Sequence, residues 1–265
     1  LLATTYHQIT FDATPPVSTI ADPNAAFENS LPTLSGAASD SPSGIKEVRA
    51  QITYLVDPNT YFWRGPGGGT AFDSAATTSL SDPLNWRGST FTAGSWSYAI
   101  STGWVTGTAY TVKARGEDNA GNLQTSLPSY AFTFDASLPG SSITTPENGK
   151  QYKSLPAIAG VASEGVSSVA ENQVLVQRQL DSFYWNGSTW QFSGSDLYNL
   201  LAGGGAWTLS IPATHYTDGG IYSVKSRAKD TPGNLTSPPA SAAITLDVSS
   251  PTVVNSTPLA SAFYN

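Results

Sequence analysis

Tyr110-Thr-Val-Lys-Ala-Arg-Gly-Glu-Asp-Asn-Ala-Gly-Asn122 returns later in the chain as Tyr222-Ser-Val-Lys-Ser-Arg-Ala-Lys-Asp-Thr-Pro-Gly-Asn234, 112 residues on (222−110). In both copies polar and apolar or small residues alternate, which is typical of a strand with one buried and one exposed face. The shared ending Asp-x-x-Gly-Asn favours a turn, because Asp bonds nearby backbone and Gly accepts a positive φ. A repeat with this spacing predicts two copies of one structural unit.

A second recurring pattern marks the ends of these units. Asp12, Asp135 and Asp247 each close a strand-like segment and stand four residues before a proline. We interpret each as the last strand of a domain followed by a short linker that proline stiffens. The sequence therefore predicts two domains, at 13–135 and 136–247. Residues 1–12 would be the last strand of a preceding domain, and 248–265 a linker and the first strand of a following one.

The segments between these marks repeat as well. Leu31-Pro-Thr-Leu-Ser-Gly36 returns as Leu155-Pro-Ala-Ile-Ala-Gly160, and the Trp96 segment returns around Trp207. Asn186-Gly187 predicts a two-residue hairpin turn, whereas residues 64–84 have no counterpart in the second copy and predict an irregular insertion. About seven short strands per copy indicate an all-β fold, with tandem immunoglobulin-like β-sandwiches in an extended rod.

Composition limits the function. A net charge of −7 argues against nucleic acid as a partner, since little would neutralise phosphates. The chain has no Cys, which excludes disulfides and thiolate metal sites. No apolar run is long enough to predict a membrane-spanning helix. The two histidines, His7 and His215, match no catalytic motif, so we predict that this chain is not an enzyme.

The order of these motifs resembles the tandem bacterial immunoglobulin-like repeats of large surface proteins and adhesins. The resemblance rests on Tyr-Trp-Asn-Gly-Ser-Thr-Trp (184–190), Trp-x-x-x-Ile, Tyr-x-Val-x-x-Arg-x-x-Asp-x-x-Gly-Asn and strand-Asp-x-x-x-Pro, and it covers nearly the whole chain. It implies an extracellular or cell-surface location and a structural or adhesive role as a spacer or fibre building block. The implied partners are neighbouring immunoglobulin-like domains or copies of the chain in a filament. It also places Tyr110 and Tyr222 where such sandwiches carry a tyrosine corner.

In such a sandwich the loops after the second and sixth strands lie at the pole where the chain enters. Acidic and amide residues stand at these places in both repeats, and they are Asp12, Asp40, Asp118 and Asn122 in the first and Asp135, Glu164, Asp230 and Asn234 in the second. Calcium takes six to eight oxygen ligands, so we predict a calcium site at each junction. The alternative is that the same residues cap turns without a metal.

A binding module for carbohydrate or protein is the alternative function. Five tryptophans, Trp63, Trp86, Trp104, Trp185 and Trp190, would then form a face on which host or surface glycans stack. The competing interpretation is that aromatic side chains fill the cores and pair across strands. The sequence leaves both open.

Overall fold

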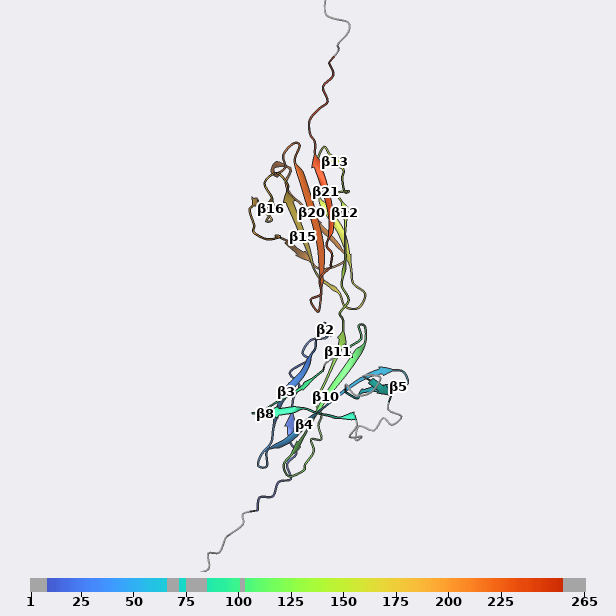
Figure 1. Ribbon diagram of the computed structural model, residues 1–265, viewed down its shortest axis with the longest axis vertical. Helices are drawn as coiled ribbons and strands as arrows, with labels where there is room; N and C mark the ends of the chain where they lie inside the picture. Colours follow the sequence, from blue (N-terminus) through green and yellow to red (C-terminus); the bar gives the residue numbers. More distant parts are fainter. Residues whose placement is uncertain (1–8, 66–71, 75–84, 101–102, 255–265) are drawn as a thin grey trace, which may run out of the picture. The chain divides into compact units, whose positions relative to one another are not determined.

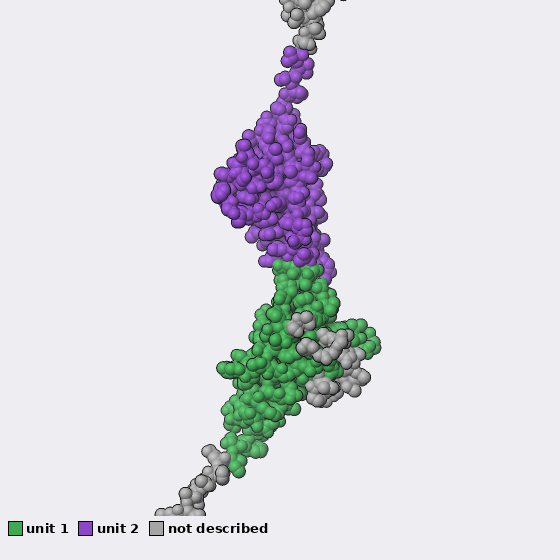
Figure 2. Space-filling view, viewed as in Figure 1, with its two compact units in different colours: residues 1–137, 232–234 green, residues 138–231, 235–265 purple. Residues whose placement is uncertain are grey.

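The computed structural model describes residues 9–65, 72–74, 85–100 and 103–254. These residues form two compact units, 1–137 with 232–234 and 138–231 with 235–265 (Figure 2). Each unit consists of β-strands in two sheets (Figure 1). The fold class expected from the sequence, tandem immunoglobulin-like sandwiches, is therefore confirmed, while the residue bounds 13–135 and 136–247 stay predictions.

The first unit pairs a small sheet with a large one. The strands of the small sheet follow the order β1 (Val17–Ser18), β3 (Thr33–Ser39), β9 (Ser95–Ala99) and β8 (Thr90–Thr92). The large sheet has the order β2 (Phe27–Glu28), β11 (Ser129–Phe134), β10 (Ala109–Asp118), β4 (Ile45–Val56), β5 (Asn59–Trp63) and β6 (Phe72–Ser74), with β7 (Arg87–Gly88) also on β4. All neighbours are antiparallel except β2 and β11, which run parallel.

The second unit repeats this plan. Its small sheet has the order β12 (Gly140–Thr145), β14 (Ile158–Ser163) and β19 (Ala206–Leu209). Its large sheet has the order β13 (Gln151–Tyr152), β21 (Ala240–Leu246), β20 (Ile221–Asp230), β15 (Val169–Arg178), β16 (Phe183–Trp185) and β17 (Trp190–Gln191), with β18 (Asn199–Ala202) on β15. A short 3₁₀ helix, Ala213–His215, precedes β20.

The repeated strand is the centre of each large sheet. In β10, Tyr110, Val112 and Ala114 are buried in the core between the sheets, and their neighbours along the strand face outward. In β20, Tyr222 and Val224 occupy the same positions. The alternation seen in the sequence thus decides which face of the strand enters the core.

A tryptophan from the small sheet fills each core. Trp96 of β9 lies opposite Gly36 of β3, and a Cβ at Gly36 would stand 2.5 Å from the indole nitrogen and 2.0 Å from the Thr19 carbonyl oxygen. Trp207 covers Gly160 in the same way. Glycine is required at both positions because the indole and the backbone occupy the space of a side chain.

The expected tyrosine corner is present in both units. The Tyr110 hydroxyl accepts a hydrogen bond from the Val105 N–H at 2.9 Å, and the Tyr222 hydroxyl accepts one from the Thr217 N–H at 2.9 Å. In each case the donor lies five residues upstream of the tyrosine. The bond joins the start of the central strand to the crossing segment before it.

One local expectation is wrong. The loop between β16 and β17 has four residues, because the Asn186 side chain accepts the Ser188 and Thr189 N–H groups and only Gly187 has a positive φ. The two-residue turn would need positive φ at both Asn186 and Gly187. The described parts of the terminal segments, 9–12 and 248–254, have no strand pairing. The assignment of 1–12 and 248–265 to neighbouring domains stays a prediction. The rest of those segments, and most of 64–84, lie outside the described residues.

Candidate metal centre

Three predicted carboxylates meet at one end of the first unit. Oxygen atoms of Asp12, Asp40 and Asp118 lie within 4.8 Å of one another. Asp118 is fully buried, and Asp12 and Asp40 are partly buried. None of the ion pairs among the described residues includes any of the three. The cluster therefore concentrates negative charge in a partly buried place, and no cation of the described residues pairs with it.

Asp118 reaches the cluster because β10 ends in a register shift. The pairing of β10 with β4 slips between Glu117 and Asp118, so that Asp118 stands opposite Ile45. Such a bulge re-aims the side chain that follows it. The turn that follows β10 brings Asn122 back to Asp118, and the backbone N–H and the Nδ2 of Asn122 each donate to the Asp118 carboxylate at 2.7 Å.

Asp40 is held by the loop that follows β3. Its Oδ2 accepts the Gly44 N–H at 2.9 Å and the Ser43 hydroxyl at 3.1 Å. Its Oδ1 is buried and has no hydrogen-bond partner. An unsatisfied buried carboxylate oxygen is costly and requires an explanation, such as an ion.

Asp12 joins the leading segment, residues 9–16, to the sandwich. Its carboxylate accepts the Thr14 N–H at 2.9 Å and the Ser43 N–H at 3.0 Å. Its carbonyl oxygen accepts Asn122 Nδ2 at 3.1 Å. The segment is therefore bound to both loops that carry the other two carboxylates.

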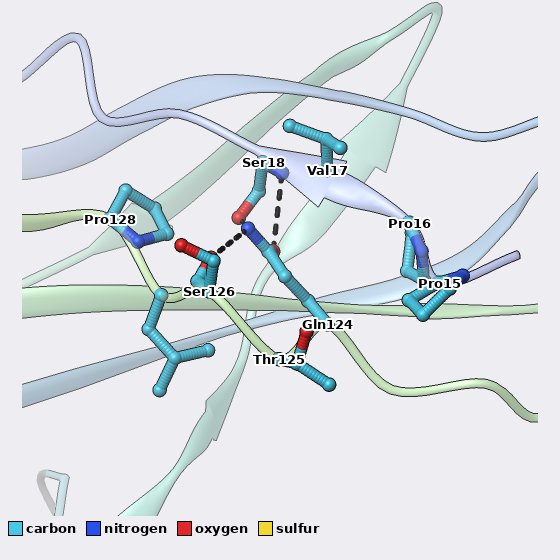
Figure 3. Close-up of a pocket in the computed structure, with 9 residues that line it drawn as sticks. Pro15, Pro16, Val17, Ser18, Gln124, Thr125, Ser126 and Pro128 are labelled. Atoms are coloured by element: carbon cyan, nitrogen blue, oxygen red, sulfur yellow. Dashed lines mark hydrogen bonds between the residues drawn. The ribbon is translucent and has the colours of Figure 1, made fainter.

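Gln124 anchors the chain just after the leading segment (Figure 3). Its Oε1 accepts the Ser18 hydroxyl at 2.6 Å and the Ser18 and Gly116 N–H groups at 3.1 Å. Its Nε2 donates to the Ser126 carbonyl at 2.8 Å. A groove of about 440 Å³ beside it is lined by Pro15, Pro16 and Pro128 among others. These bonds fix β1 and limit where Asp12 can lie.

Local hydrogen bonds shift the titration of two of the carboxyls. Those from Ser43 and Thr14 hold the pKa of Asp12 below its ordinary value of 3.8. Burial raises the pKa of Asp118, but the hydrogen bonds from Asn122 lower it by more, so that the net pKa is also below 3.8. Both groups are therefore ionised at neutral pH, as a cation site requires.

These depressed pKa values predict an acid-sensitive first unit. The unfolded chain binds protons at these groups before the folded chain does, so their contribution to stability is present above about pH 4 and is lost as pH falls below 3.8. We expect Tm, measured in chelator, to fall through this range. The Asp12→Asn/Asp118→Asn variant should show a shallower fall, and a fall equal to that of the unchanged chain would contradict the assignment.

The second predicted set consists of residues from both units. Asp135 is counted with the first unit, as is Asn234, whose Nδ2 donates to the Asp135 carbonyl at 2.9 Å. This bond is the counterpart of the one from Asn122 to Asp12. Glu164 and Asp230 belong to the second unit, where Glu164 accepts the Gly165 and Val166 N–H groups and Asp230 is buried. A calcium site formed by these four residues stays a prediction.

Sequence reasoning missed Ser43 and Gln124, because serine and glutamine in polar loops carry no distinctive signal. It also overestimated the tryptophans. Trp63, Trp86 and Trp185 are 1–3 % exposed, and Trp104 and Trp190 pack against the cores. The structure therefore contradicts a sugar-stacking face formed by these five side chains. His215 packs against Trp185 with ring centres 4.8 Å apart, and His7 lies outside the described residues.

The comparisons with known proteins concern the fold. No family model matches the sequence, and no curated protein matches it. Similar solved structures include fibronectin(III)-like modules of Clostridium thermocellum CbhA, at 14 % identity and a TM-score of 0.39, covering 87 % of this chain and 94 % of that one. A Ca²⁺-stabilized adhesin with which an Antarctic bacterium binds ice is 17 % identical, with a TM-score of 0.36 over 89 % of this chain.

The adhesin InvE of Yersinia pseudotuberculosis is 14 % identical, with a TM-score of 0.28, over 87 % of this chain and 58 % of that one. This chain spans 50 % of the length of the Antarctic adhesin. The resemblance to bacterial immunoglobulin-like repeats agrees with these findings as regards the fold, which rests on the strand order given above. Among the described residues, no helix has the length and apolar character needed to cross a membrane.

Proposed function

We propose that Asp12, Asp40 and Asp118 bind a calcium ion that fixes the leading segment to the first sandwich. The observation that supports this most is the group of three carboxylates whose oxygens lie within 4.8 Å of one another. Two oxygens on one calcium ion are at most about 4.6–5.2 Å apart, twice the usual Ca–O distance. Asp40 Oδ1, buried and without a partner, is a vacant acceptor in this group.

Calcium suits the donor set better than smaller or softer ions. All three acidic ligands are hard oxygens, and water and backbone carbonyls would complete the set with neutral oxygen ligands. Calcium accepts such a mixture in irregular geometry, whereas magnesium demands a near-ideal octahedron and zinc prefers nitrogen and sulfur. Bound calcium would also offset the mutual repulsion of the carboxylates.

The role that follows is mechanical. An ion that joins the leading segment to the loops around Asp40 and Asp118 would restrict movement at a domain junction, and Asp135, Glu164, Asp230 and Asn234 would form a second such site. The chain is then a structural spacer or fibre building block of an extracellular bacterial surface protein or filament. Its partners are neighbouring immunoglobulin-like domains or copies of itself, and repeated stiff junctions hold a rod extended.

Calorimetric titration tests the proposal directly. Calcium added to the chelator-treated chain should bind with the heat of at least one site, and Asp118→Asn should remove that site because it deletes a charge from the buried ligand. Asp57→Asn, which removes the same charge from an exposed turn, should leave the titration unchanged. Absence of binding to the unaltered chain at millimolar calcium would refute the proposal.

A further inference from the structure

The outer face of the large sheet in the first unit carries a cluster of cationic donors. Arg115 of β10 stands directly opposite Arg49 of β4, and Lys113 stands opposite Gln51. All four side chains lie on the face away from the core, because Ala50, Ile52, Val112 and Ala114 alternate with them into it. Like charges directly opposite each other on a sheet are destabilising.

Only part of this charge is neutralised within the protein. Arg49 donates to Glu47 through Nε at 2.9 Å. Among the described residues, Lys113 and Arg115 have neither an ion pair nor a hydrogen bond with a side chain. Burial and the neighbouring Arg49 lower the pKa of Arg115, and the nearby Glu117 and Glu47 offset only part of this shift. Lys113 and Arg115 therefore have N–H groups that can donate hydrogen bonds to a ligand.

One buried aromatic side chain, Trp86, packs against the cluster. The Arg115 guanidinium lies 4.6 Å from the ring centre of Trp86, which is only 3 % exposed and is not part of the core between the sheets. This contact orients the guanidinium. Gln51, 1 % exposed, has a buried Nε2 without a hydrogen-bond partner. Because this nitrogen is buried, a ligand at the surface does not reach it, and the donors of the cluster are those of Arg49, Lys113 and Arg115.

In the second unit, the cations at the same positions have hydrogen-bond or ion-pair partners within the protein. Arg227, the counterpart of Arg115, stands opposite Gln173 and donates to its Oε1 at 2.6 Å. Lys225, the counterpart of Lys113, pairs with Asp196 at 3.0 Å. Leu175 replaces Gln51. The donor-rich arrangement is therefore specific to the first unit and is not a requirement of the fold.

We propose that Arg49, Lys113 and Arg115 form a binding site for the carboxylates of an acidic polysaccharide. Guanidinium groups present a planar fork that matches a carboxylate, and every free group of the cluster is a donor. Lys113 and Arg115 are two residues apart on one face, about 7 Å along the strand, so they offer two contacts to a chain with repeated charges.

The surroundings favour a sugar chain over a protein partner. The outward neighbours of Lys113 are the hydroxyl side chains of Thr111, Thr53 and Ser129, which can exchange hydrogen bonds with sugar hydroxyls. Protein interfaces are anchored by exposed aromatic side chains, whereas Trp86 and Phe62 beside the cluster are already buried. The ligand is therefore polyhydroxylated and anionic. This inference does not depend on calcium at the metal centre.

The test uses tetragalacturonate as the anionic probe and maltotetraose as a neutral sugar of equal length, both titrated into the whole chain. Tetragalacturonate should bind and maltotetraose should not. Lys113→Gln/Arg115→Gln should weaken binding by about ten-fold or more. The matched control, Lys225→Gln/Arg227→Gln, removes the same charges at the same positions of the second unit and should leave binding unchanged.

Arg49→Gln provides a second variant that should fold, because it installs the pair that Arg227 and Gln173 already form in the second unit. It should weaken tetragalacturonate binding while Tm stays constant or rises. Equal loss of binding in the control variant would show general charge attraction and overturn the site. Absence of tetragalacturonate binding, or tighter binding of a tetraglutamate peptide, would overturn the polysaccharide.

Discussion

Trp96→Ala is expected to lower the free energy of unfolding of the first unit by about 3–5 kcal/mol. The indole is 1 % exposed, covers Gly36 and donates from Nε1 to the Thr19 carbonyl at 2.9 Å. Its removal leaves a cavity between the sheets and an unpaired Thr19 carbonyl just after the edge strand β1. Because protein interiors are close-packed, the neighbouring side chains can fill that space only in part.

Chemical denaturation with separate probes for the two units measures this effect. Trp207→Ala should cause a similar loss in the second unit, since Trp207 covers Gly160 in the same way. Leu180→Ala, at a side chain that is 86 % exposed, should change stability by less than about 0.5 kcal/mol. A loss below about 1 kcal/mol for Trp96→Ala would mean that Trp96 is not a core residue.

Calcium should stabilise the first unit by about 2.7 kcal/mol at a free concentration one hundred times its Kd. The gain arises because the folded chain presents Asp12, Asp40 and Asp118 together, whereas the unfolded chain separates them. Thermal unfolding in calcium and in excess chelator measures it. Asp118→Asn should abolish the difference, and Asp57→Asn should preserve it.

A stabilisation that survives in Asp118→Asn would place the calcium elsewhere, for example at the set of Asp135, Glu164, Asp230 and Asn234. A melting curve indifferent to calcium, in a chain that calorimetry shows to be saturated, would mean that folded and unfolded states bind the ion equally. That outcome would contradict a preformed site. The two experiments therefore separate the existence of a site from its effect on folding.

The fold could be predicted from the sequence because each strand pattern occurs in both repeats. The alternation around Tyr110 and Tyr222 decides the central strands, and the paired Gly36 and Trp96 motif returns at Gly160 and Trp207. The loop at Asn186 was mispredicted because a side-chain acceptor competes with the two-residue turn. The terminal strands stay predictions, because a strand at either end of the chain depends on pairing with a neighbouring domain.

The candidate site was predictable only in part. Asp40 and Asp118 are recognisable because one follows and the other ends a strand of a repeated sandwich, and Asp12 because it recurs in the linker, so topology brings all three to one pole. Ser43 and Gln124 were missed because their role depends on loop conformation. The cluster of Arg49 and Arg115 was missed for a different reason. The register between neighbouring strands decides which charges face each other, and this register cannot be derived from the sequence alone.

Determination of the structure from crystals grown with calcium tests the central claim most directly. The account predicts an ion bound by Asp12, Asp40 and Asp118 at Ca–O distances of about 2.3–2.6 Å, with a total of six to eight oxygen ligands. The ion should exchange for a lanthanide with a strong anomalous signal at the same place. A water molecule there, or carboxylates turned away from one another in millimolar calcium, would contradict the account.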